Sequence, residues 1–277
     1  MFPVAPFIPL GYAAIAPDAS PESDPPMSIL DPTPRLADLW EAAALLSRLP
    51  VPDHNPRGGG AAWAWPLVGA GVAALAAGSG SLGIALGFGP GVVAGIILVV
   101  QSLATGGLHE DGLADSADGL WGGRTRARRL EIMKDSRIGS YGVLALLLIT
   151  LIRWSALTGL VAAGAHWPAL IAAGALSRAP MAALMWAMPN ARQGGLSHSV
   201  GRPGIATVGI GAALALGIAL AAGGAAIALG MVLAMALPVA ALALLARARI
   251  GGQTGDILGA TQQLAEAAAL SAAGARP

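Results

Sequence analysis

The stretch IATVGIGAALALGIALAAGGAAIALGMVLAMALPVAALALLA, residues 205–246, carries no charged side chain. A helix needs roughly 20 apolar residues to cross a bilayer, so this stretch is long enough for two crossings, which we place at 205–222 and 225–246. Only 11% of the 277 residues are charged, whereas soluble domains have roughly 25%. The apolar runs are continuous, unlike the alternating segments of a membrane barrel. We therefore predict an all-α, polytopic integral membrane protein.

Four more spans are predicted at about 61–79, 82–105, 142–164 and 168–188, which gives a bundle of about six transmembrane helices. The connections around Gly80, His166 and Gly223 contain no Lys or Arg, whereas the other connections and both flanks contain basic residues. By the positive-inside rule, both termini and the charged loops are expected on the cytoplasmic side.

The N-terminal segment 1–34 contains nine of the twenty prolines and is predicted to be a disordered leader, with Met27 as an alternative start. No cation precedes Arg35, so this segment does not have the pattern of a secretory signal. RLADLWEAAALLSR (35–48) predicts a short amphipathic helix on the membrane surface or packed on the bundle. Residues 35–277 are expected to form a single membrane-embedded domain. The chain has no cysteine, which excludes disulfides and thiolate chemistry.

Negative charge is concentrated in HEDGLADSADG, residues 109–119. If this segment is helical, Asp111, Asp115 and Asp118 lie on one face at i, i+4 and i+7, where like charges repel unless a cation neutralises them. Carboxylates are ligands for Mg²⁺, and the basic run 124–137 that follows is suited to phosphate oxygens. The pattern favours phosphoryl-transfer chemistry, although a mixed-charge loop between two spans can also be only a solvated connection.

The same residues carry a resemblance to a known family. GGLHEDGLADSADGLWGG (106–123) and RRLEIMKDSRIGSYG (128–142) resemble the signature of adenosylcobinamide-GDP ribazoletransferase, the cobalamin synthase family. Three shorter stretches resemble other motifs of that family: LLSRLPVP (45–52), SRAPMAALMWAMPNARQGGL (177–196) and GGQTGDILGATQQLAE (251–266). The resemblance covers roughly residues 35 to 270 in the family's order.

The resemblance implies an enzyme of late cobalamin biosynthesis in the bacterial inner membrane. Such an enzyme joins α-ribazole or its 5′-phosphate to adenosylcobinamide-GDP and releases GMP, with Mg²⁺ required. The expected partners are these two substrates and the lipid bilayer, with no nucleic acid, while the oligomeric state stays open.

On this hypothesis Asp111, Asp115 and Asp118 bind Mg²⁺ on the diphosphate, and Asp111 and Asp115 are catalytic. His109 and Asp135 are alternative candidates for the general base, although a histidine at the end of a span can equally be an interfacial hydrogen-bonding group. The candidate phosphate-binding cations are Arg128, Arg129, Lys134 and Arg137.

Two further candidates for substrate binding are Arg178 and Asp256. Arg178, like Arg153, falls inside a predicted span, where an arginine is expected to face the bundle interior, either paired or near a ligand. Pro180 next to Arg178 can break the helix and open a polar pocket. Asp256 either adds a fourth carboxylate to the metal, bonds a nucleotide or caps a helix.

Two other functions stay open. A CDP-alcohol phosphatidyltransferase-like enzyme also uses aspartates at a cytoplasmic membrane face, but its DGxxAR element has Arg where this chain has Asp115. A small-molecule transporter would use Arg153 and Arg178 as midplane charges. The sequence shows no internal repeat of the kind that many transporters have.

Overall fold

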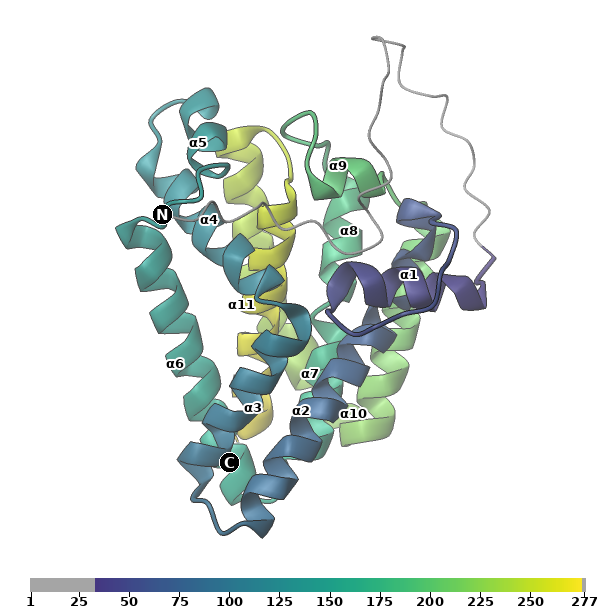
Figure 1. Ribbon diagram of the computed structural model, residues 1–277, viewed down its shortest axis with the longest axis vertical. Helices are drawn as coiled ribbons and strands as arrows, with labels where there is room; N and C mark the ends of the chain where they lie inside the picture. Colours follow the sequence, from purple (N-terminus) through teal and green to yellow (C-terminus); the bar gives the residue numbers. More distant parts are fainter. Residues whose placement is uncertain (1–32, 276–277) are drawn as a thin grey trace.

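The computed structural model describes residues 33–275, which form a bundle of helices without a β-strand (Figure 1). The all-α prediction is confirmed for this part of the chain. The predicted leader and the alternative start at Met27 fall mostly or wholly outside the described residues. In chain order the elements are α1 (Leu36–Leu46), η1 (Gly58–Ala64), α2 (Trp65–Ala85), α3 (Pro90–Thr105), α4 (Leu108–Gly122), α5 (Arg126–Ile132), α6 (Ser140–Ala162), α7 (His166–Leu176), α8 (Ala179–Ala187), α9 (Leu196–Val200), α10 (Ile205–Ile250) and α11 (Gly255–Gly274).

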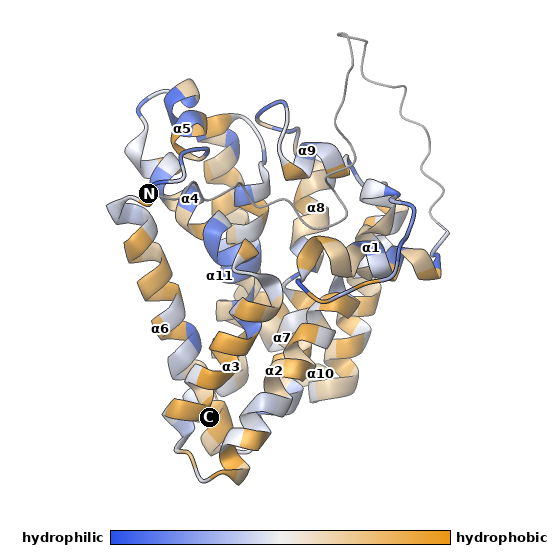
Figure 2. Cartoon of the chain, viewed as in Figure 1, coloured by the Kyte–Doolittle hydropathy of each residue, from blue (hydrophilic) through white to orange (hydrophobic). Residues whose placement is uncertain are grey.

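Four helical stretches in the described range are long and apolar enough to cross a membrane: Gly58–Ala85, Ser140–Ala162, His166–Ala187 and Ile205–Ile250. The pair α3 and α4 adds a fifth if the two helices, bent by 89°, form one broken span. Hydrophobic residues cover α6, α2 and α10, whereas hydrophilic residues gather around α5 and the upper half of α11 (Figure 2). This distribution is that of a polytopic membrane protein, as predicted.

The long α10 is a hairpin rather than one rod. Its helical geometry is interrupted at Gly224, which has φ 76° and ψ 174°. Just before α10, Arg202 donates to the Trp186 carbonyl, and just after it the Gln253 amide donates to the Pro189 carbonyl. Both ends of α10 therefore lie beside the end of α8, and its two limbs run antiparallel. The turn predicted around Gly223 is confirmed.

The turn predicted around Gly80 is wrong. Helix α2 continues through Gly80 to Ala85, and the chain reverses over residues 86–89 instead. A Cβ atom placed on Gly80 would lie 2.8 Å from Cδ1 of Ile97, so this glycine lets α3 pack closely on α2. The helix predicted at 82–105 consequently begins later, at Pro90, and corresponds to α3.

The predicted surface helix 35–48 is confirmed as α1, and buried acids fasten it to the bundle. The Asp38 carboxylate accepts hydrogen bonds from Arg57 Nη1 and Trp63 Nε1, each at 2.7 Å. The Glu41 carboxylate accepts from the backbone amides of Arg57 and Gly58, also at 2.7 Å. Helix α1 is therefore packed on the bundle.

The direction of α4 is set by Gly106 and Gly107, which join it to α3. Both have left-handed backbone angles, φ 65° and φ 71°, which glycine adopts without a steric penalty. They produce the 89° bend between the two helices. As a result α4 runs towards the end of the bundle that carries α5 and α9 (Figure 1).

Candidate active site

The acidic segment is helical, as predicted, and its three aspartates differ in burial. Asp111 is exposed, Asp115 is half-buried and Asp118 is buried. Asp115 lies close enough to Asp111 and Asp118 for like-charge repulsion. The three residues, here called the acidic stripe, therefore lead from the protein surface into the bundle.

A contact between two glycines brings a fourth carboxylate to the acidic stripe. A Cβ atom on Gly112 of α4 would lie 2.9 Å from the Asp256 carbonyl oxygen and 3.1 Å from Cα of Gly259 in α11. The two helices therefore touch backbone to backbone. This approach places Asp256 within electrostatic reach of Asp111 and Asp115.

The structure assigns the helix cap to a residue other than Asp256. Thr254 is the N-cap of α11, because its hydroxyl accepts a hydrogen bond from the Ile257 amide at 3.3 Å. Asp256 lies in the first turn, and burial raises the pKa of its carboxyl above the usual value. Its side chain is therefore available to the acidic site.

Asp118 holds the beginning of α6. Its carboxylate accepts hydrogen bonds from the backbone amides of Gly139 at 2.7 Å and Gly142 at 2.9 Å. Both oxygens of Asp118 thus have partners within the protein, and the metal site that Asp118 was predicted to share with Asp111 and Asp115 stays a prediction. Among residues 33–275, no three acidic or histidine side chains converge closely enough to hold a metal ion.

Arg192 belongs to the acidic site, although it was not among the predicted site residues. Its Nη2 atom lies 3.1 Å from Oδ2 of Asp256. The loop that carries it pairs with the segment before α11, since the Ala191 amide donates to the Gln253 carbonyl at 2.8 Å. Two motifs that are about sixty residues apart in the sequence thus meet beside α4. Two sequence signals point to Arg192: it lies in the stretch 177–196 that resembles a family motif, and Gly194 and Gly195 follow it.

The predicted phosphate-binding cations lie around α5, and three of the four have partners within the protein. Arg128 pairs with Glu131 at 2.9 Å, and Arg129 donates to the Arg249 carbonyl at 3.3 Å. Lys134 is exposed. Helix α5 packs on the acidic helix, because Met133 lies against Gly119.

Asp135, one candidate base, forms an ion pair with Arg137 at 2.6 Å. Hydrogen bonds from Arg137 lower the pKa of the Asp135 carboxyl to about 2. Such a carboxylate accepts protons weakly at neutral pH. In the structure Asp135 is paired with Arg137 at the surface, and its role as general base stays a prediction.

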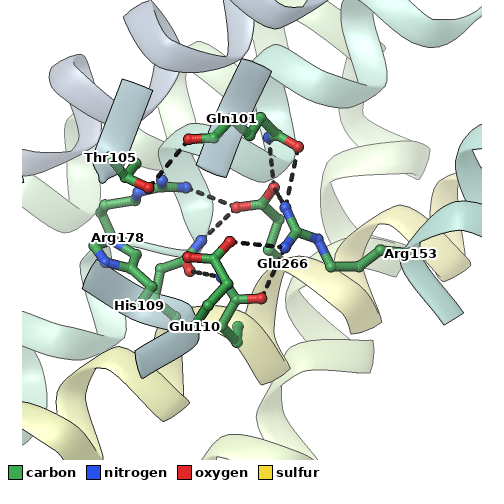
Figure 3. Close-up of a pocket in the computed structure, with 9 residues that line it drawn as sticks. Gln101, Thr105, His109, Glu110, Arg153, Arg178 and Glu266 are labelled. Atoms are coloured by element: carbon green, nitrogen blue, oxygen red, sulfur yellow. Dashed lines mark hydrogen bonds and ion pairs between the residues drawn. The ribbon is translucent and has the colours of Figure 1, made fainter. Parts of the chain in front are cut away.

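A buried polar cluster lies deeper in the bundle, around Glu266 of α11 (Figure 3). The Glu266 carboxylate contacts Arg178 Nη1 at 2.8 Å, Arg153 Nη2 at 3.0 Å and Gln101 Nε2 at 2.7 Å. The expectation that both intramembrane arginines face the interior and are paired is confirmed. Arg178 follows the end of α7 at the break before α8 and donates a hydrogen bond to the Ser177 hydroxyl, while its role in substrate binding stays a prediction.

His109, the other candidate base, belongs to this buried polar cluster. It is 1% exposed, and neither ring nitrogen has a hydrogen-bond partner in the described structure. It lines a small cavity with Arg153, Arg178 and Glu266 (Figure 3). The charges of these three residues act on the His109 ring, and no charge of the acidic stripe is among them. Its role as general base stays a prediction.

The acidic helix, the loop of Arg192 and the start of α11 all lie within the part of the chain that matches a known family. The family described as cobalamin-5-phosphate synthase matches residues 38–274.

The chain belongs to this family.

Several curated relatives are named adenosylcobinamide-GDP ribazoletransferase. The protein from Bradyrhizobium diazoefficiens is 45% identical over 246 residues, covering 87% of this chain and 94% of the relative. The proteins from Mesorhizobium japonicum and Rhizobium meliloti are 42% and 41% identical, and cover 88% and 86% of this chain and 95% and 97% of their own lengths. No solved structure matches this chain significantly. The resemblance found in the sequence is confirmed, and the cobalamin-5-phosphate synthase family is favoured over the CDP-alcohol alternative.

Proposed function

We propose that Asp111, Asp115, Asp256 and Arg192 form the site at which this chain joins α-ribazole or its 5′-phosphate to adenosylcobinamide-GDP with release of GMP. The activity, that of an adenosylcobinamide-GDP ribazoletransferase, follows from family membership and from the names of the relatives. The observation that carries the location is the glycine contact between α4 and α11. It gathers carboxylates and one guanidinium from three separate motifs.

The carboxylates fit a magnesium ion that arrives with the substrate. Mg²⁺ prefers oxygen ligands and is commonly held by one or two carboxylates together with substrate phosphates and water. Asp111 and Asp115 supply such carboxylates at the surface end of the acidic stripe. When bound, Mg²⁺ would neutralise charge on the diphosphate and on the departing GMP.

The transfer is a displacement at phosphorus. A ribazole hydroxyl attacks the phosphorus that stays with cobinamide, the bond from that phosphorus to the oxygen of GMP breaks, and the hydroxyl proton passes to a base. The carboxylates of Asp111 and Asp115 and the diphosphate are all anionic and repel one another. These aspartates can therefore position the diphosphate only through a cation that lies between them. Half-burial of Asp115 and Asp256 limits the water that screens these charges.

We place the site on the cytoplasmic face of the bacterial inner membrane. Helix α4, which carries the acidic stripe, runs towards the end of the bundle that carries α5 and α9 (Figure 1). The basic connection between α4 and α6 and the last turn of α10, with Arg247 and Arg249, are at this end. Under the positive-inside rule such an end faces the cytoplasm.

The test compares three variants in proteoliposomes supplied with adenosylcobinamide-GDP, α-ribazole 5′-phosphate and varied Mg²⁺. Asp111→Asn and Asp115→Asn should each lower turnover by at least roughly a hundredfold, because a phosphoryl transfer relies on this charge stabilisation. Glu131→Gln is the matched control, because Glu131 is an exposed acid on α5 whose ion pair within the described residues is with Arg128. Near-normal turnover of both aspartate variants would refute the location, and wild-type turnover of CDP-diacylglycerol instead would refute the activity.

A further inference from the structure

Arg192 is the basic side chain that reaches the acidic site. Its Nη2 atom lies 3.1 Å from Oδ2 of Asp256, and its charge also acts on Asp115, more weakly than burial and the neighbouring acids Asp256, Asp111 and Asp118 do. The ion pair is largely shielded, with side-chain exposed fractions of 15% for Arg192 and 16% for Asp256. Arg192 therefore occupies part of the space in which a cation would neutralise these carboxylates.

The guanidinium of Arg192 is only partly used by the protein. A guanidinium has five N–H donors in a planar fork. The Nη1 atom of Arg192 is buried and has no hydrogen-bond partner within the described structure. By contrast, Arg128 and Arg137 pair with Glu131 and Asp135 at the surface. Arg192 thus combines unfilled donors with a position beside the aspartates.

The backbone before Arg192 is held by hydrogen bonds, and two glycines with positive φ follow it. The Ala191 amide donates to the Gln253 carbonyl, and Arg126 donates to the Ala191 carbonyl at 2.9 Å. Two residues after Arg192, Gly194 and Gly195 have φ 79° and φ 88°. The backbone next to Arg192 is therefore fixed at Ala191, whereas the guanidinium is held by the ion pair with Asp256.

We propose that Arg192 is an exchangeable counter-ion: it neutralises Asp256 and Asp115 in the free protein and then binds the diphosphate of the GDP-activated substrate. The inference rests on the function proposed above. When the substrate enters with its cation, the carboxylates gain that cation as their partner, and Arg192 turns its planar fork to phosphate oxygens. Arginine is suited to both partners because it matches carboxylate and phosphate geometry in a bidentate way.

The exchange predicts effects of opposite sign on two binding reactions. Without nucleotide, Arg192 competes with a divalent cation for the carboxylates, so its removal should strengthen cation binding. With the diphosphate present, Arg192 contributes contacts, so its removal should weaken substrate binding. An arginine that only holds the loop in place would weaken both reactions when removed.

The experiment uses the purified full chain in nanodiscs, with Mn²⁺ binding followed by electron paramagnetic resonance and adenosylcobinamide-GDP binding followed by calorimetry in Mg²⁺. Arg192→Gln should bind Mn²⁺ alone roughly two- to fivefold more tightly, the effect of removing one partly screened ion pair. It should bind adenosylcobinamide-GDP at least roughly tenfold more weakly, the effect of losing a charge-assisted hydrogen bond.

Two further variants separate charge from loop structure. Arg192→Lys keeps the charge without the fork, so its Mn²⁺ affinity should stay near wild type and its substrate affinity should lie between wild type and Arg192→Gln. Arg126→Gln removes a contact to the loop backbone without touching an acid, and should not tighten Mn²⁺ binding. Weaker or unchanged Mn²⁺ binding by Arg192→Gln, or unchanged substrate affinity, overturns the inference. Failure of the wild-type protein to bind or convert adenosylcobinamide-GDP overturns the proposed function instead.

Discussion

Gly112 and Gly259 meet where α4 crosses α11. A Cβ atom on Gly112 would lie 3.1 Å from Cα of Gly259, and one on Gly259 would lie 3.2 Å from Cα of Gly112. Both neighbours are backbone atoms, which cannot turn aside as a flexible side chain can. This contact positions Asp256 beside the acidic stripe, so the separation of the two helices controls the geometry of the site.

We expect Gly259→Ala to lower both stability and turnover. An added methyl group at a close-packed contact costs typically about 1–3 kcal/mol, and the helices must separate to accept it. Gly95→Ala on α3 is the control, because a Cβ atom there meets nothing within 4 Å. Thermal unfolding in detergent and the Km for Mg²⁺ would be measured for both variants. A Gly259→Ala protein as active as Gly95→Ala would show that the contact does not set the site.

Asp118→Asn should destabilise the protein without changing its Mg²⁺ dependence. The Asp118 carboxylate accepts two backbone amides at the start of α6, and an asparagine offers only one acceptor oxygen to them. Loss of a hydrogen bond to a charged group costs about 1.5–3 kcal/mol. Asp111→Asn should give the reverse pattern, with normal stability and lost Mg²⁺-dependent activity. A large rise in the Mg²⁺ requirement of Asp118→Asn, at normal stability, would return Asp118 to the metal site.

Glu266→Gln should be among the most destabilising single changes. It removes the anion shared by Arg153 and Arg178, and the removal of one partner of a buried ion pair costs about 3–5 kcal/mol. Adding Arg153→Gln to Glu266→Gln restores the balance of charge and should recover part of the loss. Unfolding midpoints of the single and double variants in one detergent test this coupling. Strictly additive losses would mean that the cluster does not act as a unit.

The acidic limb of the pH–rate profile should not depend on Asp135. Because Arg137 lowers the pKa of Asp135 to about 2, below its usual value of 3.8, the carboxylate stays charged at every pH above about 4. Asp135→Asn is therefore expected to leave the acidic limb of kcat/KM between pH 5 and 8 in place, even if the rate falls because Arg137 loses its partner. A shift of that limb by a full pH unit would identify Asp135 as the titrating base.

The sequence by itself determined the features that depend on local pattern. The length of the apolar runs fixed most of the crossings and the hairpin at Gly224, because a helix in a bilayer must satisfy its own backbone. The spacing of Asp111, Asp115 and Asp118 fixed their common face once the segment became helical. The motifs also identified the family.

Only the tertiary structure decided which of these residues share a site. Asp256 and Arg192 reach the acidic stripe through the contact of α4 with α11 and the pairing of residues 189–191 with Gln253. The Asp118 carboxylate bonds the start of α6, and the His109 ring lies in the buried cluster around Glu266. These outcomes depend on which helices pack together and how closely. Small residues such as Gly80 and Gly112 permit a close approach, but they do not specify which helix approaches. Local periodicity carries no information about contacts between segments far apart in the chain, so the site became complete only in the folded bundle.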